Sequence, residues 1–377
     1  MEVVLAGAGH THIEIIRQAE KFREMGHRLT IVSPLKHHPY SGMAPGMLGG
    51  TYSYDDILLP AYSLAEAGGA AFIQDAVAGI NTRTSVIRLV HGGAISYDIA
   101  SVNIGSDAAE DHVQGDHIFT VKPIERLFEA KTYISNLASS RSPFRVVVAG
   151  GGPAGVEVAG NVSHLITSLR NSGMPARGRV SLYASSSSSI GGYRGRAGAY
   201  ILKTLRQMGV AVHQGERFTL SVHGKSDAAD AVLLASGVRP AGVISTLGLP
   251  VGKTGSITVN KYLQVTGEQA VFAVGDCAEF SVGKTASLDR VGVYAVRQQQ
   301  VLLHNLLMKV SGNSDQLIPF RKYGPYLSGL NLGGGIGLLQ WKGFLLTGRK
   351  AFLIKDFIDR RFIRRYSVSE GLGGQDD

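Results

Sequence analysis

Apolar and polar residues in the first part of the chain follow two alternating periods. Residues 3–5 (Val-Val-Leu) form a β-branched, apolar run that ends at the Gly-Ala-Gly of residues 7–9. From residue 13 to about residue 25, Ile, Ala and Phe recur at helical spacing. The pattern therefore predicts a strand, a glycine turn and a helix in immediate succession.

This succession is the context that a dinucleotide-binding loop needs. We expect Gly7 to permit the tight turn and Gly9 to let backbone N–H groups approach a pyrophosphate, which the helix N-terminus attracts by its partial positive charge. His12 stands where the third glycine of the G-x-G-x-x-G pattern is expected. Alone, this loop is a weak signal, and it gains weight because the chain repeats it.

The second copy lies at residues 145–162 (RVVVAGGGPAGVEVAGNV). Residues 146–148 form an apolar strand, and Gly150, Gly152 and Gly155 complete the full pattern before a valine-rich helix begins. Two nucleotide loops predict two bound nucleotides. The usual reason for two is to bring a nicotinamide against a flavin.

Turn-bounded apolar runs predict the remaining elements. Strands are expected at residues 28–32, 70–76, 85–89, 100–104, 179–184, 231–235, 255–265 and 270–276. Helices are expected at 124–137, 291–309 and 349–366, and residues 319–348 read as short strands in which GGGIG (333–337) forms a hairpin turn.

The predicted fold class is α/β, with two Rossmann-like domains of a three-layer ββα type, a C-terminal β-hairpin and an amphipathic helix. We expect two nucleotide-binding domains and a C-terminal region (311–377) that faces a membrane or a partner. The chain is expected to cross into the second domain over residues 107–123.

Two positions that are usually acidic carry serine instead. An acid at the end of the second strand of a dinucleotide fold holds the adenosine ribose. Ser33 stands there in the first domain, and the serine run 185–189 stands there in the second. Because Arg194 and Arg196 follow, one interpretation is a site for the 2′-phosphate of NADPH. The favoured interpretation is a solvated loop.

Two further stretches have open interpretations. The glycine- and proline-rich segment 37–50 is either a surface loop or a lining for a flat ring, and its apolar character favours the lining. Asp276 follows an apolar strand and Gly275. Its carboxylate is either a hydrogen-bond acceptor for a sugar-alcohol chain or a helix N-cap.

Composition limits the chemistry. The 377 residues are 44% hydrophobic and 18% charged, which is typical of a packed α/β enzyme. The single cysteine, Cys277, excludes a dithiol relay and a thiolate cluster. His10 and His12 share a turn and His37 and His38 are adjacent, so we predict no metal site. No apolar run approaches the roughly 18 residues of a spanning helix, and the strand near Met1 leaves no space for a signal peptide.

Charge is concentrated near the C-terminus. The formal net charge is +9, and residues 341–366 hold eight basic and two acidic residues, which gives +6. Residues 349–366 form an amphipathic pattern with one basic face, so they either lie on an anionic membrane surface or pack on the body of the protein. The expected location is the cytoplasm, with peripheral attachment to the inner face of the cell membrane as the alternative.

The chain resembles the pyridine nucleotide-disulfide oxidoreductase superfamily of FAD-dependent proteins. It is most similar to the type II NADH dehydrogenases and sulfide:quinone oxidoreductases, and within these to the NADH dehydrogenase-like flavoprotein that is often fused to selenophosphate synthetase. The matching stretches are GAGHTH (7–12), PYSGMAPG (39–46), VKP (121–123), GGGPAGVE (150–157), GVYAVRQ (292–298) and KDFIDRRF (355–362).

The resemblance implies a discontinuous FAD-binding domain (1–115 plus 255–310), completed by the returning segment, and an NAD(P)-binding domain (116–254) for NADH or NADPH. It places Gly7, Gly9 and His12 at the FAD pyrophosphate, Gly275 and Asp276 at the ribityl chain, and Pro45 near the isoalloxazine. It places Gly150, Gly152, Gly155 and Glu157 at the nicotinamide nucleotide. The remaining predicted cofactor contacts are His10, Thr11, Ser33, Ala76, Gly105, Pro153, Ala154, Gly237, Val293 and Tyr294.

The resemblance also implies the reaction: FAD oxidises NAD(P)H and passes the electrons to a quinone-type acceptor. The quinone-site glutamines of the NADH dehydrogenases are not cleanly reproduced: Gln298, Gln299 and Gln300 lie in the corresponding helix, but their register does not match one to one. Hydride transfer requires no side-chain acid or base, so we assign no catalytic residue. The candidates for a side chain that assists the reaction are Glu157 and Lys122. A single cysteine disfavours sulfide oxidation.

Two alternatives remain. The same fold could act on a sulfur or selenium species, or the protein could be a flavin-binding accessory protein with a decayed nicotinamide site. The expected partners are the small-molecule acceptor, an anionic membrane surface at 349–366 and a second copy in a homodimer, with no nucleic acid.

Overall fold

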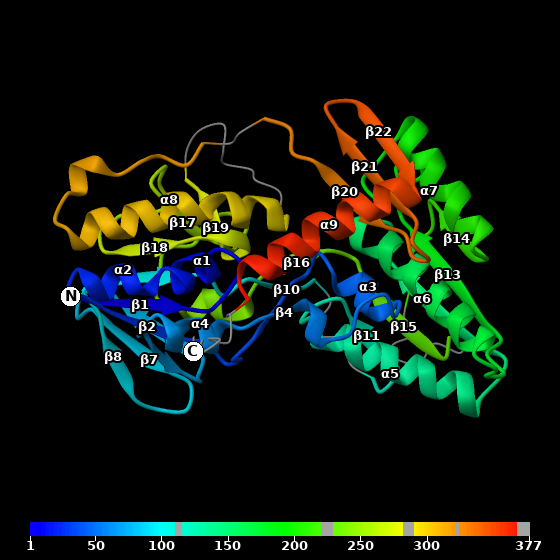
Figure 1. The fold of residues 1–377 in the computed structure, drawn as a ribbon, viewed down its shortest axis with the longest axis horizontal. Coiled ribbons are helices and arrows are strands. Elements are labelled where there is room, and N and C mark those ends of the chain that lie inside the picture. Colours follow the sequence, from blue (N-terminus) through cyan, green and yellow to red (C-terminus); the bar gives the residue numbers. More distant parts are fainter. Residues whose placement is uncertain (110–114, 220–228, 282–289, 322–323, 368–377) are drawn as a thin grey trace, which may run out of the picture.

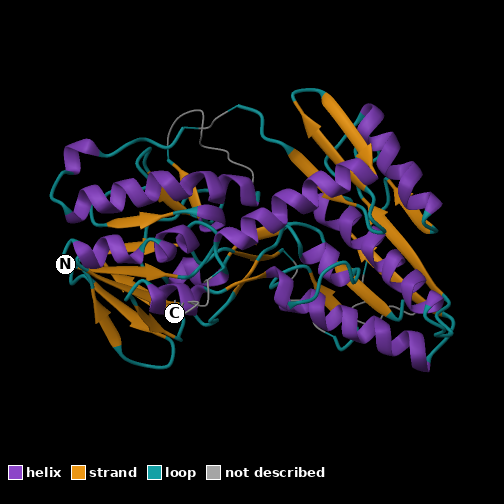
Figure 2. Cartoon of the chain, viewed as in Figure 1, coloured by secondary structure: helices purple, strands orange, loops and turns teal. Residues whose placement is uncertain are grey.

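The computed structural model describes residues 1–109, 115–219, 229–281, 290–321 and 324–367. Two lobes lie side by side, each built on a parallel five-stranded sheet with helices packed over it, and a C-terminal helix reaches from one lobe to the other (Figures 1 and 2). The fold is therefore the predicted α/β arrangement with two Rossmann-like sheets.

The first sheet has the strand order β18-β9-β1-β2-β5. Its members are β1 (Glu2–Ala6), β2 (Arg28–Val32), β5 (Ala71–Ile73), β9 (Ile99–Val102) and β18 (Val271–Ala273). β1 is central, since Val3 pairs with Leu29 of β2 and with Ile99 of β9. The last strand, β18, returns to this sheet after the chain has built the second lobe.

Helices and a small sheet complete the first lobe. The helices are α1 (His12–Arg17), α2 (Ala19–Glu24), α4 (Ala61–Ala67) and α8 (Gly292–Val310). The small antiparallel sheet contains β6 (Val77–Asn81), β7 (Val86–Leu89) and β8 (Ala94–Ser96). In Figure 1, α1 and α8 lie above the parallel sheet and the small sheet lies below it.

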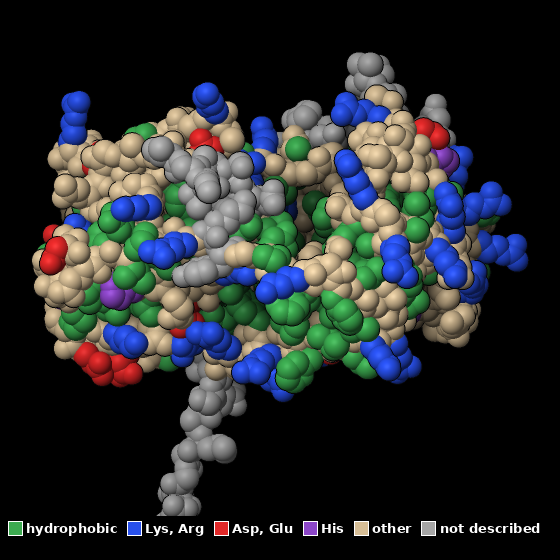
Figure 3. Space-filling model, turned by 90° about the horizontal axis from the view of Figure 1, so that it is seen from above, with side chains coloured by type: hydrophobic (Ala, Val, Ile, Leu, Met, Phe, Trp, Pro, Cys, Tyr) green, Lys and Arg blue, Asp and Glu red, His purple; other side chains and the backbone are tan. Residues whose placement is uncertain are grey.

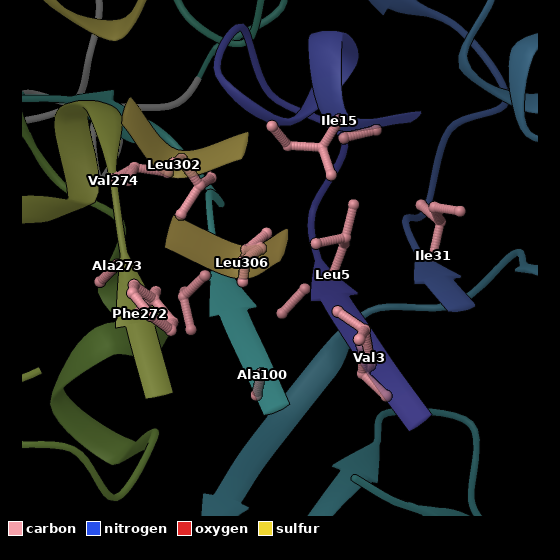
Figure 4. Close-up of a cluster of buried hydrophobic side chains, with 14 of the residues drawn as sticks. Val3, Leu5, Ile15, Ile31, Ala100, Phe272, Ala273, Val274, Leu302 and Leu306 are labelled. Atoms are coloured by element: carbon pink, nitrogen blue, oxygen red, sulfur yellow. The ribbon is translucent and has the colours of Figure 1, made fainter. Parts of the chain in front are cut away.

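The first lobe has a continuous apolar core. Figure 4 shows Leu5 of β1 and Ile15 of α1 near Leu302 and Leu306 of α8, and all four side chains are 0% exposed. Burial of one such side chain contributes about 1.5–3 kcal/mol. Because α8 closes this core, the returning segment is an integral part of the first lobe.

The second sheet repeats the first, with the order β11-β15-β12-β13-β14. Its members are β11 (Ile118–Thr120), β12 (Phe144–Ala149), β13 (Gly178–Ala184), β14 (Val210–Gln214) and β15 (Ala231–Leu234). Its helices are α5 (Glu125–Ser140), α6 (Pro153–Asn171) and α7 (Gly195–Gln207).

Two segments connect the lobes. β10 (Ser106–Ala108) follows β9, β16 (Val238–Pro240) follows β15, and the two strands pair antiparallel. The helix α3 (Ala44–Leu48) belongs to the first part of the chain but packs against α5 and α6 of the second lobe.

The C-terminal part adds an antiparallel sheet and a long helix. The strands are β20 (Ser328–Asn331), β21 (Gly337–Trp341) and β22 (Phe344–Gly348), and the helix is α9 (Arg349–Arg365). α9 packs on all three strands and runs towards α1 (Figure 1). Among the described helices, none is both long and apolar enough to span a bilayer.

Short elements fill the connections. They are β3 (His38–Pro39), β4 (Leu58–Leu59), β17 (Ile257–Val259), β19 (Ala278–Phe280) and the 3₁₀ turns η1 (Asp55–Ile57), η2 (Gly242–Thr246), η3 (Gly275–Cys277) and η4 (Ser314–Gln316).

The structure corrects several predicted elements. The helix expected from residue 13 to 25 is two helices, because Gln18 leaves the helical conformation (φ −101°, ψ 19°). The strand expected at 255–265 is only the three-residue β17, since the chain turns back at 260–264. α4 and α7 were not predicted. The GGGIG turn is confirmed, because residues 333–336 connect β20 to β21.

Candidate functional site

One cavity of about 630 Å³ lies between the lobes and touches the first glycine loop and the start of α6. On the first lobe its wall contains Gly7, Gly9 and His10, and on the second it contains Pro153 and Glu157 at the start of α6. A volume in this range is typical of small-molecule and cofactor sites. The first glycine loop and the start of α6 therefore share one space, whereas Gly150, Gly152 and Gly155, the predicted nucleotide contacts of the second loop, are not in its wall.

The first glycine loop is shaped by close backbone contact with the end of β9. Gly7 has a φ of +90°, and a Cβ there would lie 2.5 Å from the carbonyl oxygen of Asn103. A Cβ on Gly9 would lie 2.5 Å from the Asn103 Oδ1. The structure therefore requires glycine at position 7 for conformation and for space, and at position 9 for space.

Asn103 is a buried residue that the sequence analysis missed. Its Oδ1 accepts hydrogen bonds from the backbone N–H groups of Thr11 (3.0 Å) and His12 (3.2 Å), and its Nδ2 donates to the carbonyl of Val274 (3.0 Å). It thus joins the ends of β9 and β18 to the start of α1. Its position after an apolar strand, at 99–102, was the one available signal.

Two amides of the loop stay available for a ligand. Within the described residues, the backbone N–H groups of Gly9 and His10 have no hydrogen-bond partner. Asn103 already holds the next two N–H groups, so these two are the donors that an anion in the cavity can use. The Thr11 hydroxyl donates to Ala295 of α8 (2.8 Å) and lies outside the cavity wall.

His12 takes the place of the third glycine for a structural reason. Its side chain is 0% exposed, and its Nδ1 lies 2.6 Å from the Gly7 carbonyl, which can only accept a hydrogen bond. Nδ1 is therefore the donor, and Nε2 accepts from the Ser101 hydroxyl (2.8 Å). Burial lowers the pKa of His12 to about 4, so it is neutral. Its side chain does not line the cavity, in contrast to the expected pyrophosphate contact.

His10 does line the cavity. Its Nδ1 lies 2.9 Å from the Nε2 of His38, and burial lowers the pKa of His10 to about 4. The Nε2 of His10 is buried without a hydrogen-bond partner among the described residues. An orphaned polar atom in a cavity wall is the kind of group that a bound ligand satisfies.

Lys122 and Asp276 meet in the cavity wall. The Nζ of Lys122 donates to Asp276 Oδ2 (2.9 Å) and to the Ser106 hydroxyl (2.7 Å), which itself donates to Asp276 (2.8 Å). Against the effect of burial, Lys122 and Ser106 lower the pKa of Asp276. Asp276 lies in the three-residue turn η3, so it is not the N-cap of an α-helix.

Other predicted FAD contacts also lie in this wall. Ser33, Pro45, Ala76 and Gly105 all line the cavity. The Ser33 hydroxyl donates to the Leu35 carbonyl (3.1 Å). Gly275 is not in the wall; its N–H donates to the Gln298 side chain (2.6 Å). The segment 37–50 contributes Pro45 and several neighbours, as expected for a lining segment.

The three glycines of the second loop have different structural roles. A Cβ on Gly150 would lie 2.2 Å from the Ala235 carbonyl oxygen, and one on Gly155 would lie 1.7 Å from the Gly150 oxygen. No atom lies within 4 Å of a Cβ on Gly152. Gly150 and Gly155 therefore serve the fold, while Gly152 leaves open space at the start of α6, where Pro153 and Ala154 line the cavity.

The serine run forms a turn of its own. The Ser186 hydroxyl accepts hydrogen bonds from the N–H groups of Ser188 (3.3 Å) and Ser189 (3.2 Å). Gly191 then donates to the Gly151 carbonyl (2.8 Å), which places this segment beside the second glycine loop. Gly237 has open space around its Cβ position but is not in the cavity wall.

Glu157 connects the cavity to α9. Its Oε1 accepts a hydrogen bond from the backbone N–H of Asn331 (2.7 Å). Burial raises the pKa of Glu157 to about 7, although nearby Lys355 opposes the rise. The Nζ of Lys355 donates to Asp359 (2.6 Å) and to the Gly42 carbonyl (2.8 Å).

Val293 and Tyr294 lie outside the main cavity. Tyr294 lines a second groove of about 550 Å³ together with Tyr326, Ser328 and Lys342. The glutamines that follow in α8 bind within the protein: Gln299 to the His10 carbonyl (2.6 Å) and Gln300 to Glu14 (3.4 Å).

No cluster of three metal-ligating side chains occurs in the described part of the chain. Cys277 is fully buried, and burial raises its pKa to about 11, so it is not a reactive thiolate.

The residues of the cavity fit a dinucleotide with a flavin. Close-packed Gly7 and Gly9, two free N–H groups, the orphaned His10 Nε2 and a cavity that continues to Asp276 and Pro45 are what such a group requires. The family model described as pyridine nucleotide-disulphide oxidoreductase matches residues 1–300. The chain belongs to this family, whose typical cofactor is FAD, and is a flavin-dependent oxidoreductase.

Named relatives and solved structures agree with this assignment. A type II NADH:quinone oxidoreductase of Staphylococcus saprophyticus is 22% identical over 96% of this chain and 95% of its own. The structure of NDH2 from Plasmodium falciparum in complex with NADH has a TM-score of 0.82 at 12% identity and covers 97% of both chains. The sulfide:quinone oxidoreductase of Aquifex aeolicus has a TM-score of 0.75 at 15% identity and covers 98% of this chain and 93% of its own. The resemblance to the flavoprotein fused to selenophosphate synthetase stays a prediction.

Proposed function

We propose that the protein oxidises NADH through FAD and passes the electrons to a quinone-type acceptor. The observation that carries this proposal is the cavity between the lobes, because one space lined by the first glycine loop and by the start of α6 can bring two nucleotides into contact. The relatives that are 22% identical are NADH:quinone oxidoreductases, and this supports NADH as the donor and a quinone as the acceptor.

In this proposal the first lobe holds FAD. The N–H groups of Gly9 and His10 would bind its pyrophosphate, and the wall around Asp276 and Pro45 would hold the rest of the molecule. Bound FAD supplies the capacity to take up a hydride and release two electrons. The chain supplies orientation and excludes water from the contact between the two ring systems.

The second lobe would bind NADH at the start of α6. Gly152 leaves room for a pyrophosphate, and no side chain caps this helix, so its first N–H groups are free to bind an anion. Glu157, one turn further, lies in the cavity wall with a pKa near 7. A carboxyl group in this range can hold or release a proton near neutral pH within the cavity.

The acceptor would use the groove beside α8. Tyr294 and Tyr326 contact each other in a T-shaped arrangement with ring centroids 5.8 Å apart, and Lys342 lies across the groove. Aromatic walls with few polar groups suit a flat quinone ring.

To test the reaction, the purified protein is loaded with FAD and mixed anaerobically with NADH or NADPH. We expect NADH to bleach the flavin absorbance band and added menadione to restore it. A protein that binds no FAD, or whose bound FAD is not reduced by either nucleotide, would overturn the proposal. Reduction without reoxidation by the quinone would overturn the acceptor alone.

We also propose that the protein docks on an anionic membrane surface through α9 and the β21–β22 hairpin. Large apolar side chains are exposed there: Trp341, Phe344, Leu353, Ile354, Phe357 and Ile358. Exposed cations accompany them at Lys342, Lys350, Arg361 and Arg364. Figure 3 shows hydrophobic side chains exposed among Lys and Arg side chains on one face of the molecule. This combination fits anionic lipid headgroups above an apolar layer.

Point substitutions test this docking without removing the helix. Replacing Leu353 and Phe357 by serine removes about 2 kcal/mol of membrane burial for each side chain. We expect the double variant to float at least tenfold less with phosphatidylcholine–phosphatidylglycerol vesicles. The control is Val90→Ser, which removes an exposed apolar side chain from the first lobe. Equal flotation of both variants would contradict the proposal.

A further inference from the structure

The end of α9 contacts the first glycine loop through the helices α8 and α1. Tyr366, the residue after α9, is 0% exposed and is the largest fully buried side chain of the described protein. Its hydroxyl donates a hydrogen bond to Oε1 of Gln299 (3.2 Å). The Nε2 of the same Gln299 donates to the carbonyl of His10 (2.6 Å). Two hydrogen bonds therefore connect the C-terminal helix to the loop.

The carbonyl that Gln299 holds belongs to a peptide fixed at both ends. The next N–H, that of Thr11, donates to Asn103 (3.0 Å). With its oxygen and its nitrogen both bound, the His10–Thr11 peptide cannot rotate without breaking two buried hydrogen bonds. This peptide directly follows Gly9 and His10, which line the cavity and whose N–H groups have no partner among the described residues.

An ion pair also connects α9 to α1, the helix that follows the first glycine loop. Arg365 of α9 donates to Glu14 Oε1 (3.0 Å), and Arg17 donates to the same oxygen (2.7 Å). Glu14 is only 1% exposed. Although burial opposes it, the two guanidinium groups keep the pKa of Glu14 below its usual range.

Aromatic packing adds a third connection. Phe362 of α9 stacks on Tyr40 with ring centroids 4.7 Å apart, and Tyr40 lies 5.5 Å from the ring of His10. Tyr40 also donates to Asp359 of α9 (3.2 Å). Phe362, Arg365 and Tyr366 are together called the α9 end. Phe362 and Tyr366 each reach His10 of the first glycine loop through one intermediate residue, and Arg365 binds Glu14 of α1, the helix that follows the loop.

We propose that Tyr366, Gln299 and Arg365 are positioning residues for FAD: the α9 end holds the first glycine loop in its binding conformation. The proposal rests on FAD being bound at this loop. Each contact contributes to FAD affinity because a preformed loop pays no ordering cost when the cofactor binds. Packing of the α9 end and binding of FAD are therefore thermodynamically coupled: each makes the other more favourable.

The test uses the full chain and measures FAD dissociation by the fluorescence of released flavin, without NADH or an acceptor. Tyr366→Phe keeps the buried ring and removes only the hydroxyl. We expect its Kd for FAD to rise about threefold to tenfold, as for the loss of one hydrogen bond. The matched control is Tyr97→Phe in the same lobe, whose buried hydroxyl has no partner among the described residues. It should change the Kd by less than twofold.

A second pair keeps the test valid if the aromatic variant does not fold. Arg365→Gln removes the ion pair to Glu14, and Arg361→Gln removes an exposed cation one turn earlier. Arg365→Gln should weaken FAD binding and Arg361→Gln should not. Wild-type protein that binds no FAD would instead overturn the cofactor assignment. Wild-type affinity in both Tyr366→Phe and Arg365→Gln would overturn the positioning role.

Discussion

The strongest prediction concerns Asn103, which holds three buried backbone groups with one side chain. Replacing it by alanine leaves the N–H groups of Thr11 and His12 and the carbonyl of Val274 without their partner. An unsatisfied buried group costs about 1–3 kcal/mol. Because Asn103 lines the cavity, water can reach part of the space that its side chain leaves and can satisfy some of these groups. We therefore expect Asn103→Ala to lower the free energy of unfolding by about 3 kcal/mol, which is less than the full cost of three unsatisfied groups.

The same change should weaken FAD binding. Without Asn103, the start of α1 is no longer held to the end of β9, and the peptide after His10 loses one of its two fixed ends. We expect the Kd for FAD to rise at least tenfold, or about 1.4 kcal/mol. Urea unfolding of the apoprotein and titration with FAD, followed by flavin fluorescence, measure the two effects separately.

Asn305 provides a matched control. It is 0% exposed and also makes three hydrogen bonds to backbone groups, of Tyr262 (2.9 Å) and Ile318 (3.0 and 2.9 Å). Asn305→Ala should cost a similar free energy of unfolding but leave the Kd for FAD within twofold. If both variants reduce FAD affinity equally, or Asn103→Ala costs less than about 1 kcal/mol, the reasoning is refuted.

Three further predictions follow from other parts of the site. Gly152→Ala should leave the thermal midpoint unchanged, because the new Cβ meets open space, but should raise the Kd for NADH. Gly155→Ala should lower the thermal midpoint, because its Cβ would lie 1.7 Å from the Gly150 carbonyl oxygen. An equal loss of stability in both variants would contradict the different roles of the two glycines. Folded Glu157 keeps its proton up to about pH 7, whereas unfolded Glu157 loses it at about pH 4.5. The free energy of unfolding should therefore decrease as the pH rises from about 4.5 to about 7, by at most about 3 kcal/mol. Glu157→Gln should flatten that part of the urea-unfolding pH profile, and an unchanged profile would show that Glu157 is not responsible. Cys277, fully buried and with a pKa of about 11, should react with a thiol reagent only after unfolding, and fast labelling of the native protein would disprove its burial.

Local patterns were sufficient to predict the two strand–turn–helix units. The apolar runs before Gly7 and Gly150 are continuous because parallel strands are buried on both faces, and such runs are visible in a single sequence. The parallel pairing of β1 and β12 with their neighbours, and the hairpin turn at 333–336, agree with the expected arrangement. α4 has only seven residues, which is too short for a clear helical period. α7 does carry a regular apolar face, with Ala197, Ile201 and Leu205 buried, so the sequence contained a signal for it.

The apolar period of α9 did not predict which of its apolar side chains are exposed and which are packed against the protein. Leu353, Phe357 and Phe362 all belong to the amphipathic pattern, yet the first two are exposed and Phe362 packs on Tyr40. A helix that crosses from one lobe to the other meets different surroundings along its length. Periodicity identifies an apolar face but does not identify which neighbour covers each part of it.

The two glycine loops reach the same geometry by different means, and the difference matches their proposed tasks. In the second loop, Gly155 packs directly on Gly150 and the start of α6 is left uncapped and open. In the first, His12 fills the place of the third glycine, Asn103 occupies the first N–H groups of α1, and Gln299 fixes the preceding carbonyl. A loop with so many fixed groups suits a cofactor that stays bound, because its ordering cost is met during folding. An open helix start suits a nucleotide that must leave after each turnover. The departure from the glycine pattern at His12 is therefore better explained by tighter retention at the first loop than by loss of a nucleotide site.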